Sequence, residues 1–266
     1  MAVSQLESSP VGSGRRLSAR SVVASTLLGT HPPRLPGALL VALASKFGIA
    51  PGTTRVALSR MVDKGELTNT DGRYALAGHL LDRQRRQDSS IDADRRPWSG
   101  TWEQVIAVET ADAGRRTARR TSLRALKLAA LREGVWMRPA NLDPDRLPHE
   151  VCREGADLLW GTVELAGDDA ALASQLWDLD GWAARAQDLV AALRASSAQL
   201  AADDEEGLAA GFELSAATLR HFVADPELPH EVLPPGWPDR ALRGAYAAFD
   251  DAYRSLLRRF FAAHCA

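Results

Sequence analysis

The stretch that most constrains the fold lies between residues 47 and 76, where an amphipathic helix precedes a hairpin signal. Between Thr53 and Lys64, apolar residues recur with the spacing of one helical face. Pro51 suits the start of this helix because its missing N–H needs no partner there. Gly65 can end the helix, since glycine tolerates the left-handed conformation common after a helix. The residues expected to face inward are Ala57, Leu58, Met61 and Val62.

The hairpin signal follows this helix directly. Asp71-Gly72 is a dipeptide that favours a two-residue type I′ turn, because both turn positions need a positive φ. The flanking segments Glu66–Thr70 and Arg73–Leu76 have the length of short strands. Upstream, residues 18–29 and 38–47 show helical apolar spacing. Three helices and a hairpin predict a winged helix-turn-helix.

The polar face of the predicted helix carries hydroxyl and guanidinium groups, and the hairpin adds a further arginine. Arginine can form two hydrogen bonds to guanine in the major groove, and serine or threonine can bond base edges or phosphates. The pattern favours DNA binding, while a solvated helix beside an ordinary hairpin is the alternative. The residues predicted to contact DNA are Thr53, Thr54, Arg55, Ser59, Arg60 and Arg73.

A net charge of −2 conceals two halves of opposite sign. Residues 1–139 hold 22 Lys and Arg against 12 Asp and Glu, whereas residues 140–266 hold 10 against 22. A polyanionic partner such as double-stranded DNA should therefore contact the first half. We expect the acidic half to face away from DNA and to serve sensing or assembly.

Composition and periodicity divide the 266 residues into four consecutive segments. Residues 1–16 are polar and predict a disordered arm, and residues 17–96 hold the winged helix-turn-helix and a charged linker with one or two helical turns. Residues 97–169 alternate strands and helices like a split βαβ domain, and residues 170–266 predict a helical C-terminal domain. The predicted fold class is α+β and mainly helical. Expected strands lie at 102–108, 134–139 and 157–165, and expected helices at 115–131, 169–177, 177–196, 207–223 and 240–264.

No catalytic, metal-binding or nucleotide-binding motif stands out. The six histidines are scattered without an HExxH pattern, and there is no glycine-rich phosphate loop. Cys152 and Cys265 fit neither a disulfide nor a metal pattern, which favours free thiols in a reducing cytoplasm. No apolar run approaches the ~20 residues that span a bilayer. We therefore expect a cytoplasmic protein that is not an enzyme, with no catalytic residue, metal or bound cofactor.

Several segments match a known family in the same order along the chain. They are TTRVALSRMVDKGEL, WSGTWEQVIAV, LREGVWMRP, LWDLDGWA and DPELPHEVLPPGWPDRAL. With these segments the chain resembles the PaaX family, bacterial transcriptional repressors of phenylacetate catabolism, from Leu17 almost to its end. The proline-rich pattern from Asp225 to Trp237 is the most specific match. In the family's recognition helix two arginines stand five residues apart, as Arg55 and Arg60 do here.

The resemblance implies a homodimeric cytoplasmic repressor that is associated with the nucleoid when it binds an inverted-repeat DNA operator. It also implies a ferredoxin-like central domain and release from DNA by an aromatic acyl-CoA effector such as phenylacetyl-CoA. Two departures leave the operator and the effector open. The loop HPPRLPGALL lacks the Gly-Gly and Trp common in the family, and the hairpin NTDGRYAL is poorer in basic residues.

Two other functional interpretations stay open. The central domain resembles that of CRISPR adaptation nucleases, so a metal-dependent nuclease-like protein is the alternative function, with Glu109 and Asp112 as its carboxylates. The third interpretation is an interaction protein whose rear helices bind a partner. The run from Asp225 to Trp237 is either a rigid connector or part of an effector pocket.

Overall fold

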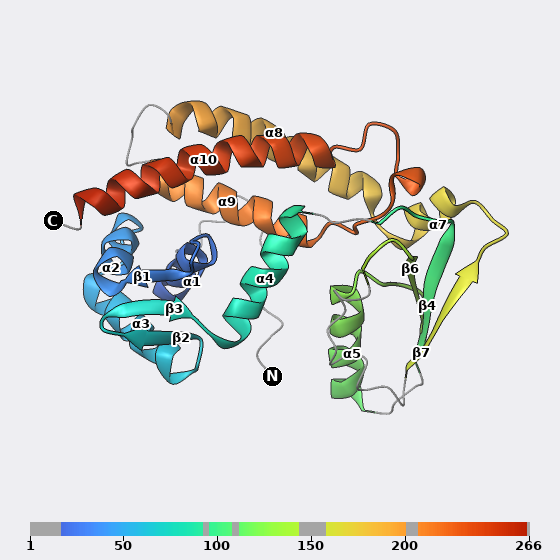
Figure 1. The fold of residues 1–266 in the computed structure, drawn as a ribbon, viewed down its shortest axis with the longest axis horizontal. Coiled ribbons are helices and arrows are strands. Elements are labelled where there is room, and N and C mark those ends of the chain that lie inside the picture. Colours follow the sequence, from blue (N-terminus) through green and yellow to red (C-terminus); the bar gives the residue numbers. More distant parts are fainter. Residues whose placement is uncertain (1–16, 93–95, 108–111, 144–157, 201–206, 265–266) are drawn as a thin grey trace. The chain divides into compact units, whose positions relative to one another are not determined.

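The computed structural model in Figure 1 describes residues 17–92, 96–107, 112–143, 158–200 and 207–264. The described chain is mainly helical and has two small antiparallel sheets, which confirms the predicted α+β class. Cys152, Cys265, Glu109 and the N-terminal arm lie outside the described residues. Among the described helices, none is both long and apolar enough to cross a membrane.

The chain forms two compact units. The first combines the residues up to 91 with 188–223 and those from 241 onward, and the second combines 92–187 with 224–240. This division differs from the consecutive domains predicted from the sequence. The reason is that the C-terminal helices bury apolar side chains in the same unit as the N-terminal helices, as described below.

The first unit begins with three helices and a three-stranded sheet. Ser18 caps the first helix, because its hydroxyl accepts a hydrogen bond from the Ser21 N–H at 3.1 Å. The Asp71-Gly72 turn has φ values of 52° and 75°, as a type I′ hairpin requires. The elements are α1 (Ala19–Leu28), β1 (Arg34–Pro36), α2 (Gly37–Lys46), α3 (Pro51–Asp63), β2 (Leu67–Thr70) and β3 (Arg73–Leu76).

Strand β1 pairs with β3 on the side opposite β2, so the sheet order is β1-β3-β2. The sequence does not predict β1, because three residues in a proline-rich loop become a strand only by pairing with β3. Apolar side chains from the helices meet the inner face of this sheet. The resulting core consists of Val23, Ala24, Leu27, Leu28, Leu35, Leu40, Leu58, Met61, Leu67, Leu76 and Leu80.

The segment predicted as a charged linker with one or two helical turns forms a continuous helix, α4 (Gly78–Asp92). Much of its buried face is polar, so apolar spacing does not reveal the helix. Gln84 donates from Nε2 to the Leu28 carbonyl at 2.9 Å and so satisfies the end of α1. Arg243 donates to the Ser90 carbonyl at 2.7 Å, which does the same for the end of α4.

The second unit contains an antiparallel sheet with the order β5-β6-β4-β7. The helix predicted at 115–131 ends at Ala125, and its last residues form a strand instead. Lys127 has a φ of 63°, a left-handed conformation through which a helix cannot continue. The elements are β4 (Thr101–Ala107), α5 (Ala113–Ala125), β5 (Ala129–Arg132), β6 (Val135–Pro139) and β7 (Leu158–Glu164).

The proline-rich run at 225–237 is held to the second unit by polar and aromatic contacts. Glu227 Oε1 lies 3.2 Å from Lys127 Nζ, and both side chains are largely buried. Trp237 stacks on Trp182 with 4.6 Å between ring centroids. These contacts favour the rigid connector among the two interpretations of this run.

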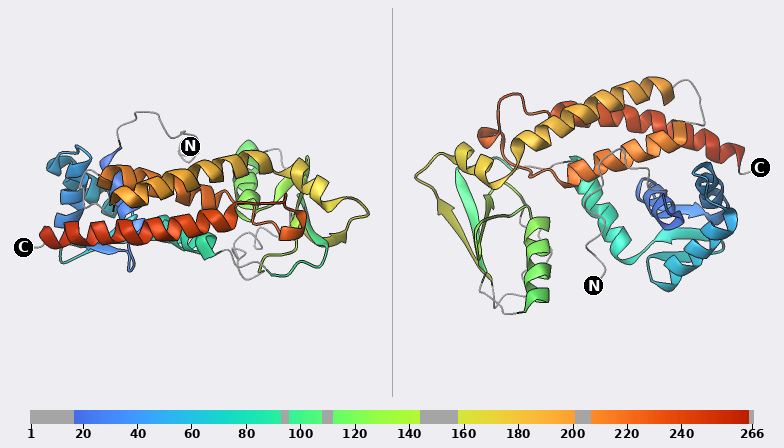
Figure 2. Two further views of the ribbon diagram at one scale, coloured as in Figure 1. Left: turned by 90° about the horizontal axis from the view of Figure 1, so that it is seen from above. Right: turned by 180° about the vertical axis from the view of Figure 1, so that it is seen from behind.

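The C-terminal helices lie side by side in both views of Figure 2. Within the first unit, Phe212 packs edge-on against Phe47, which lies in the turn between α2 and α3, with 4.9 Å between centroids. Phe261 packs against the core of the N-terminal helices. The remaining elements are α7 (Asp169–Leu176), α8 (Leu179–Leu200), α9 (Gly207–Val223), the short 3-10 turn η2 (His230–Val232) and α10 (Asp239–Ala263).

Candidate nucleic-acid interface

Helix α3 has one buried stripe and a broad exposed face. Thr54, Leu58 and Met61 are buried, at i, i+4 and i+7 of the helix. Val56 is 51% exposed and Ser59 is exposed on the opposite side. The buried stripe therefore fixes which side chains of α3 can meet a partner.

The two arginines of α3 lie on opposite flanks of its exposed face. Arg55 and Arg60 are both exposed. A helix turns by about 100° per residue, so side chains five residues apart point about 140° apart around the axis. The pair therefore does not form one column; it brackets Val56 and Ser59. Thr53 lies on the Arg60 side and is also exposed.

Thr54 was predicted to contact DNA, but the structure buries its side chain. Its side chain is 0% exposed, and its hydroxyl has no hydrogen-bond partner among the described residues. Threonine counts as polar in a sequence pattern, but position 54 shares the inward stripe of Leu58 and Met61. Thr54 cannot reach a nucleic acid without unfolding the first turns of α3.

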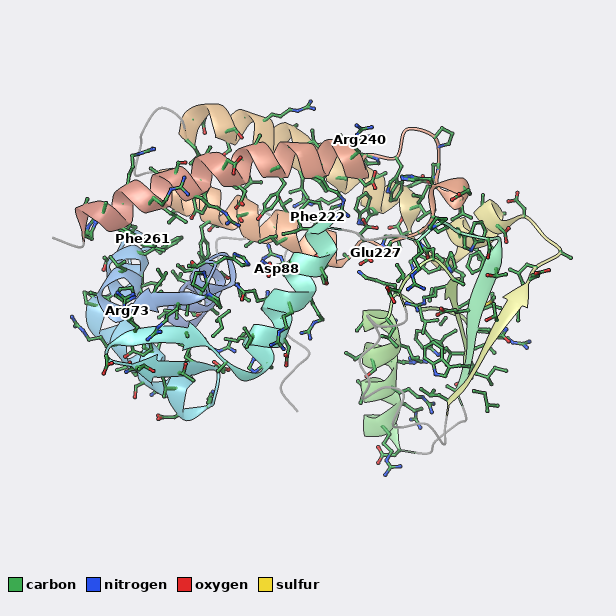
Figure 3. All side chains as sticks on the ribbon, in the orientation of Figure 1. Arg73, Asp88, Phe222, Glu227, Arg240 and Phe261 are labelled. Carbon is green, nitrogen blue, oxygen red and sulfur yellow. The ribbon has the colours of Figure 1, made fainter. Side chains whose placement is uncertain are left out.

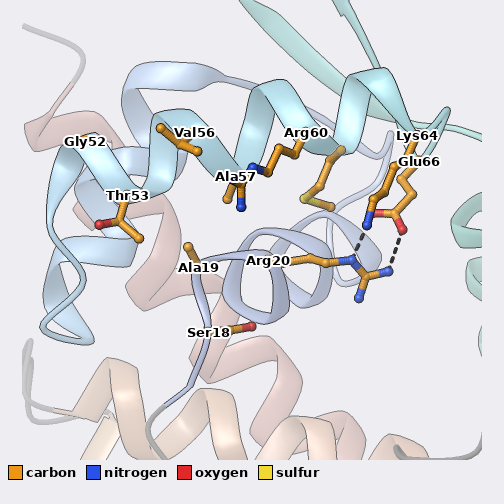
Figure 4. Close-up of a pocket in the computed structure, with 11 residues that line it drawn as sticks. Ser18, Ala19, Arg20, Gly52, Thr53, Val56, Ala57, Arg60, Lys64 and Glu66 are labelled. Atoms are coloured by element: carbon orange, nitrogen blue, oxygen red, sulfur yellow. Dashed lines mark hydrogen bonds and ion pairs between the residues drawn. The ribbon is translucent and has the colours of Figure 1, made fainter. Parts of the chain in front are cut away.

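An open groove of about 590 Å³ lies between α3 and the start of α1 (Figure 4). The α3 side presents Thr53, Arg60 and Lys64 along one flank. Lys64 is exposed and was not among the predicted residues, because the sequence marks it only as the helix end. The groove is lined by Ser18, Ala19, Arg20, Gly52, Thr53, Val56, Ala57, Arg60, Met61, Lys64 and Glu66.

A half-buried ion pair, in which only the carboxylate is buried, lies at one end of this groove. Arg20 donates from Nε and Nη2 to the two carboxylate oxygens of Glu66, at 2.9 and 2.7 Å. The hydrogen bonds from Arg20 lower the pKa of Glu66, although burial of the carboxylate opposes this. Glu66 is 5% exposed. Arg20 therefore compensates the negative charge of Glu66. As a result, Glu66 does not cancel the positive charge that Arg60 and Lys64 give to this flank of α3.

Arg73 lies on the β2–β3 hairpin (Figure 3), and this hairpin is hydrogen-bonded to the start of α2. The Gly37 N–H donates to the Gly72 carbonyl in the turn at 2.8 Å. A Cβ at Gly37 would lie 2.8 Å from the Tyr74 ring, so glycine is needed for this close approach. Arg73 itself is exposed. On the neighbouring strand β1, Arg34 is exposed as well and was not predicted.

Of the two carboxylates considered for a nuclease, only Asp112 lies among the described residues. Asp112 caps α5, accepting hydrogen bonds from the Gly114 and Arg115 N–H groups at 2.7 and 3.0 Å. Both hydrogen bonds lower the pKa of Asp112, and the bond from the Arg115 N–H has the larger effect. Glu109 lies outside the described residues. Among the residues that are described, no group of three or more His, Cys, Asp and Glu side chains could hold a metal ion.

Two models of one protein family match the N-terminal and C-terminal parts of the chain. The family model described as PaaX-like protein matches residues 18–80, which include α3 and the hairpin. A second model, the C-terminal domain of PaaX-like proteins, matches residues 177–263. The chain belongs to the PaaX-like family. Membership of the PaaX-like family indicates a transcriptional regulator.

One solved structure is similar over nearly the whole PaaX-like chain. It is titled "Uncharacterized protein Rv0674 from Mycobacterium tuberculosis" and is 40% identical in sequence. The match has a TM-score of 0.71 and covers 91% of this chain and 98% of that chain. No curated protein matches the chain.

We predict that Thr54→Val stabilises this PaaX-like protein by about 1 kcal/mol, because it removes a buried hydroxyl that has no partner. Urea denaturation followed by circular dichroism measures the free energy of unfolding. Thr53→Val on the exposed side is the matched control and should change that free energy by less than about 0.5 kcal/mol. A clear loss of stability in Thr54→Val would mean that the hydroxyl is satisfied.

We predict that Arg20→Gln lowers the free energy of unfolding by about 1 kcal/mol at pH 7, since it removes two charged hydrogen bonds from the buried carboxylate of Glu66, and solvent partly screens the exposed side of Arg20. The pKa of Glu66 lies below its ordinary value of 4.5, so the stabilisation is present above that value. The difference between wild type and variant should disappear as the pH falls through the lowered pKa. Exposed Arg194→Gln on α8 is the control, and a pH-independent difference would contradict the ion-pair explanation.

Proposed function

We propose that this protein is a DNA-binding transcriptional repressor whose N-terminal part, from α1 to the β2–β3 hairpin, is a winged helix-turn-helix. The observation that carries the proposal is the exposed face of α3, bracketed by Arg55 and Arg60, in a segment that the PaaX-like family model matches. Helix α3 is the recognition helix, and the hairpin is the wing.

The side chains of α3 suit a major groove. A helix with its side chains is about as wide as that groove, so residues on its two flanks face the two groove walls. Arg55 and Arg60 then contact guanine edges or phosphates on opposite walls, and Thr53 and Ser59 add hydroxyl groups. The exposed apolar side chain of Val56 at the centre fits the methyl group of thymine.

The proposed repressor acts as a homodimer on an inverted-repeat operator. Two copies of α3 would enter successive major grooves about 34 Å apart. What supports this part of the proposal is family membership, because repressors with a recognition helix commonly match their own two-fold symmetry to that of the operator.

The second unit contains a central domain that we propose is ferredoxin-like. Its sheet order β5-β6-β4-β7 reads 2-3-1-4 when β4 is counted as strand 1. All neighbouring strands in this sheet are antiparallel. Helix α5 connects the first strand to the second, as in a split βαβ unit. The segment between the third and fourth strands lies outside the described residues.

The effector that we propose is an aromatic acyl-CoA such as phenylacetyl-CoA, bound away from α3. The contact of Phe212 with Phe47 connects the C-terminal helices directly to the DNA-binding module. The contact of Arg243 with the end of α4 connects them to the helix that follows this module. An effector that prefers a different arrangement of these helices weakens DNA binding, and by linkage DNA weakens effector binding by the same factor.

We predict that Arg55→Gln and Arg60→Gln each weaken binding to the operator by about 1–3 kcal/mol, roughly 5- to 150-fold. The cause is loss of a guanidinium that bonds two acceptors at once. Fluorescence anisotropy with DNA from the protein's own promoter region measures the dissociation constant. Arg194→Gln, a change of the same charge on α8, is the control. Unchanged affinity in the double variant would remove α3 from the interface.

We predict that phenylacetyl-CoA raises the dissociation constant of the operator complex at least tenfold, and that operator DNA weakens phenylacetyl-CoA binding equally. Anisotropy and isothermal titration calorimetry measure the two affinities. Coenzyme A without its acyl group and free phenylacetate are the controls. A ligand that raises the melting temperature but leaves DNA affinity unchanged contradicts the switch while leaving DNA binding intact.

A further inference from the structure

The pairing register of the first sheet gathers four polar side chains on its outer face. Arg34 of β1 lies opposite Ala75 of β3, and Thr68 of β2 lies opposite the same residue. Two residues from Ala75 along β3, Arg73 lies opposite Thr70. Residues directly opposite each other in a sheet point to the same side, so these side chains share one face.

This outer face is exposed and contains no carboxylate. Arg34, Thr68, Thr70 and Arg73 are all exposed. No ion pair involves Arg34 or Arg73 among the described residues of the chain. The nearest carboxylate along the strands is Asp71, which lies in the turn rather than on the face. The face therefore presents two guanidinium groups and two hydroxyl groups to solvent.

The two arginines are diagonal neighbours on adjacent strands. Such neighbours lie about 7–8 Å apart, which is comparable with the separation of successive phosphates along one DNA strand. That spacing is between backbone positions, and the long arginine side chains can adjust the separation of their guanidinium groups to it; two such charges on neighbouring strands repel each other when nothing lies between them. An anionic backbone with the same repeat would relieve that repulsion and bind both charges.

The backbone that carries these side chains is well fixed. On the inner face, Leu35 opposite Tyr74 joins the core of the N-terminal helices. The Leu76 N–H donates to the Pro33 carbonyl at 3.1 Å, and the Gly72 carbonyl accepts from Gly37 at 2.8 Å. A binding surface on a fixed strand pays little ordering entropy apart from that of its own side chains.

We propose that Arg34 and Arg73 bind successive phosphates of one strand of duplex DNA, with Thr68 and Thr70 donating further hydrogen bonds to the same backbone. The inference rests on the proposed function as a DNA-binding regulator and assigns β1 to its interface. Contacts of this kind position the protein on DNA and depend on salt, but they carry no base specificity.

The test measures how the observed DNA association constant depends on salt for wild type, Arg34→Gln, Arg73→Gln and the double variant. Each lost phosphate contact should reduce the slope of log K against log salt by about 0.9. Affinity should fall by the same factor for the operator and for a scrambled duplex of equal length. Arg34→Lys should restore the slope, because an ammonium group also binds a phosphate, and Arg194→Gln should leave it unchanged.

Three outcomes would overturn the inference. A wild-type slope in Arg34→Gln beside a reduced slope in Arg73→Gln removes β1 from the interface and leaves the proposed function standing. A loss confined to the operator means that Arg34 reads bases rather than phosphates. A wild-type protein that binds neither duplex overturns the proposed function together with the inference. The melting temperature of Arg34→Gln should match that of wild type, because the side chain is exposed.

Discussion

The rotation of α3 about its axis is the constraint on which the rest of the proposed interface depends. Leu58 and Met61 are buried in the core of the N-terminal helices, and burial of each contributes about 1.5–3 kcal/mol. Turning the helix by one residue, about 100°, would bring these side chains out of the core. Packing therefore decides that Val56 faces outward and that Arg55 and Arg60 fall on either flank. Core packing, rather than surface charge, therefore determines which side chains of α3 are available to contact a nucleic acid.

Features with a strong local cause could be predicted from the sequence, and features that depend on distant partners could not. The Asp71-Gly72 turn needs only two positive φ angles, and α9 has apolar residues at regular helical spacing. Strand β1 exists only because β3 lies beside it, and α4 is held partly through the buried amide of Gln84. At the site, a pattern that counts threonine as polar places Thr54 on the exposed face, whereas three-dimensional packing places it inside.

Charge is distributed differently from the basic front and acidic rear that the sequence indicates. Among the residues that the structure describes, the first unit holds 16 Lys and Arg against 9 Asp and Glu, and the second holds 11 against 14. Because α9 and α10 belong largely to the first unit, acidic residues of the rear half lie in the same unit as α3. The local arrangement then matters more than the sum. Glu66 lies beside the positive flank of α3, and Arg20 compensates its charge at hydrogen-bonding distance.

The contacts between the C-terminal helices and the N-terminal helices have free energies comparable with a typical allosteric coupling free energy. Phe212 meets Phe47 in the turn just before α3, and Arg243 satisfies the Ser90 carbonyl at the end of α4. Leaving such a buried carbonyl unsatisfied costs about 1–3 kcal/mol, and an allosteric coupling free energy is typically about 1–3 kcal/mol as well. A second arrangement of α9 and α10 therefore has to replace these contacts or lose stability by that amount. Under the proposed regulation, a ligand that stabilised such a second arrangement would supply the difference, and the turn before α3 is the place where it would act on DNA affinity.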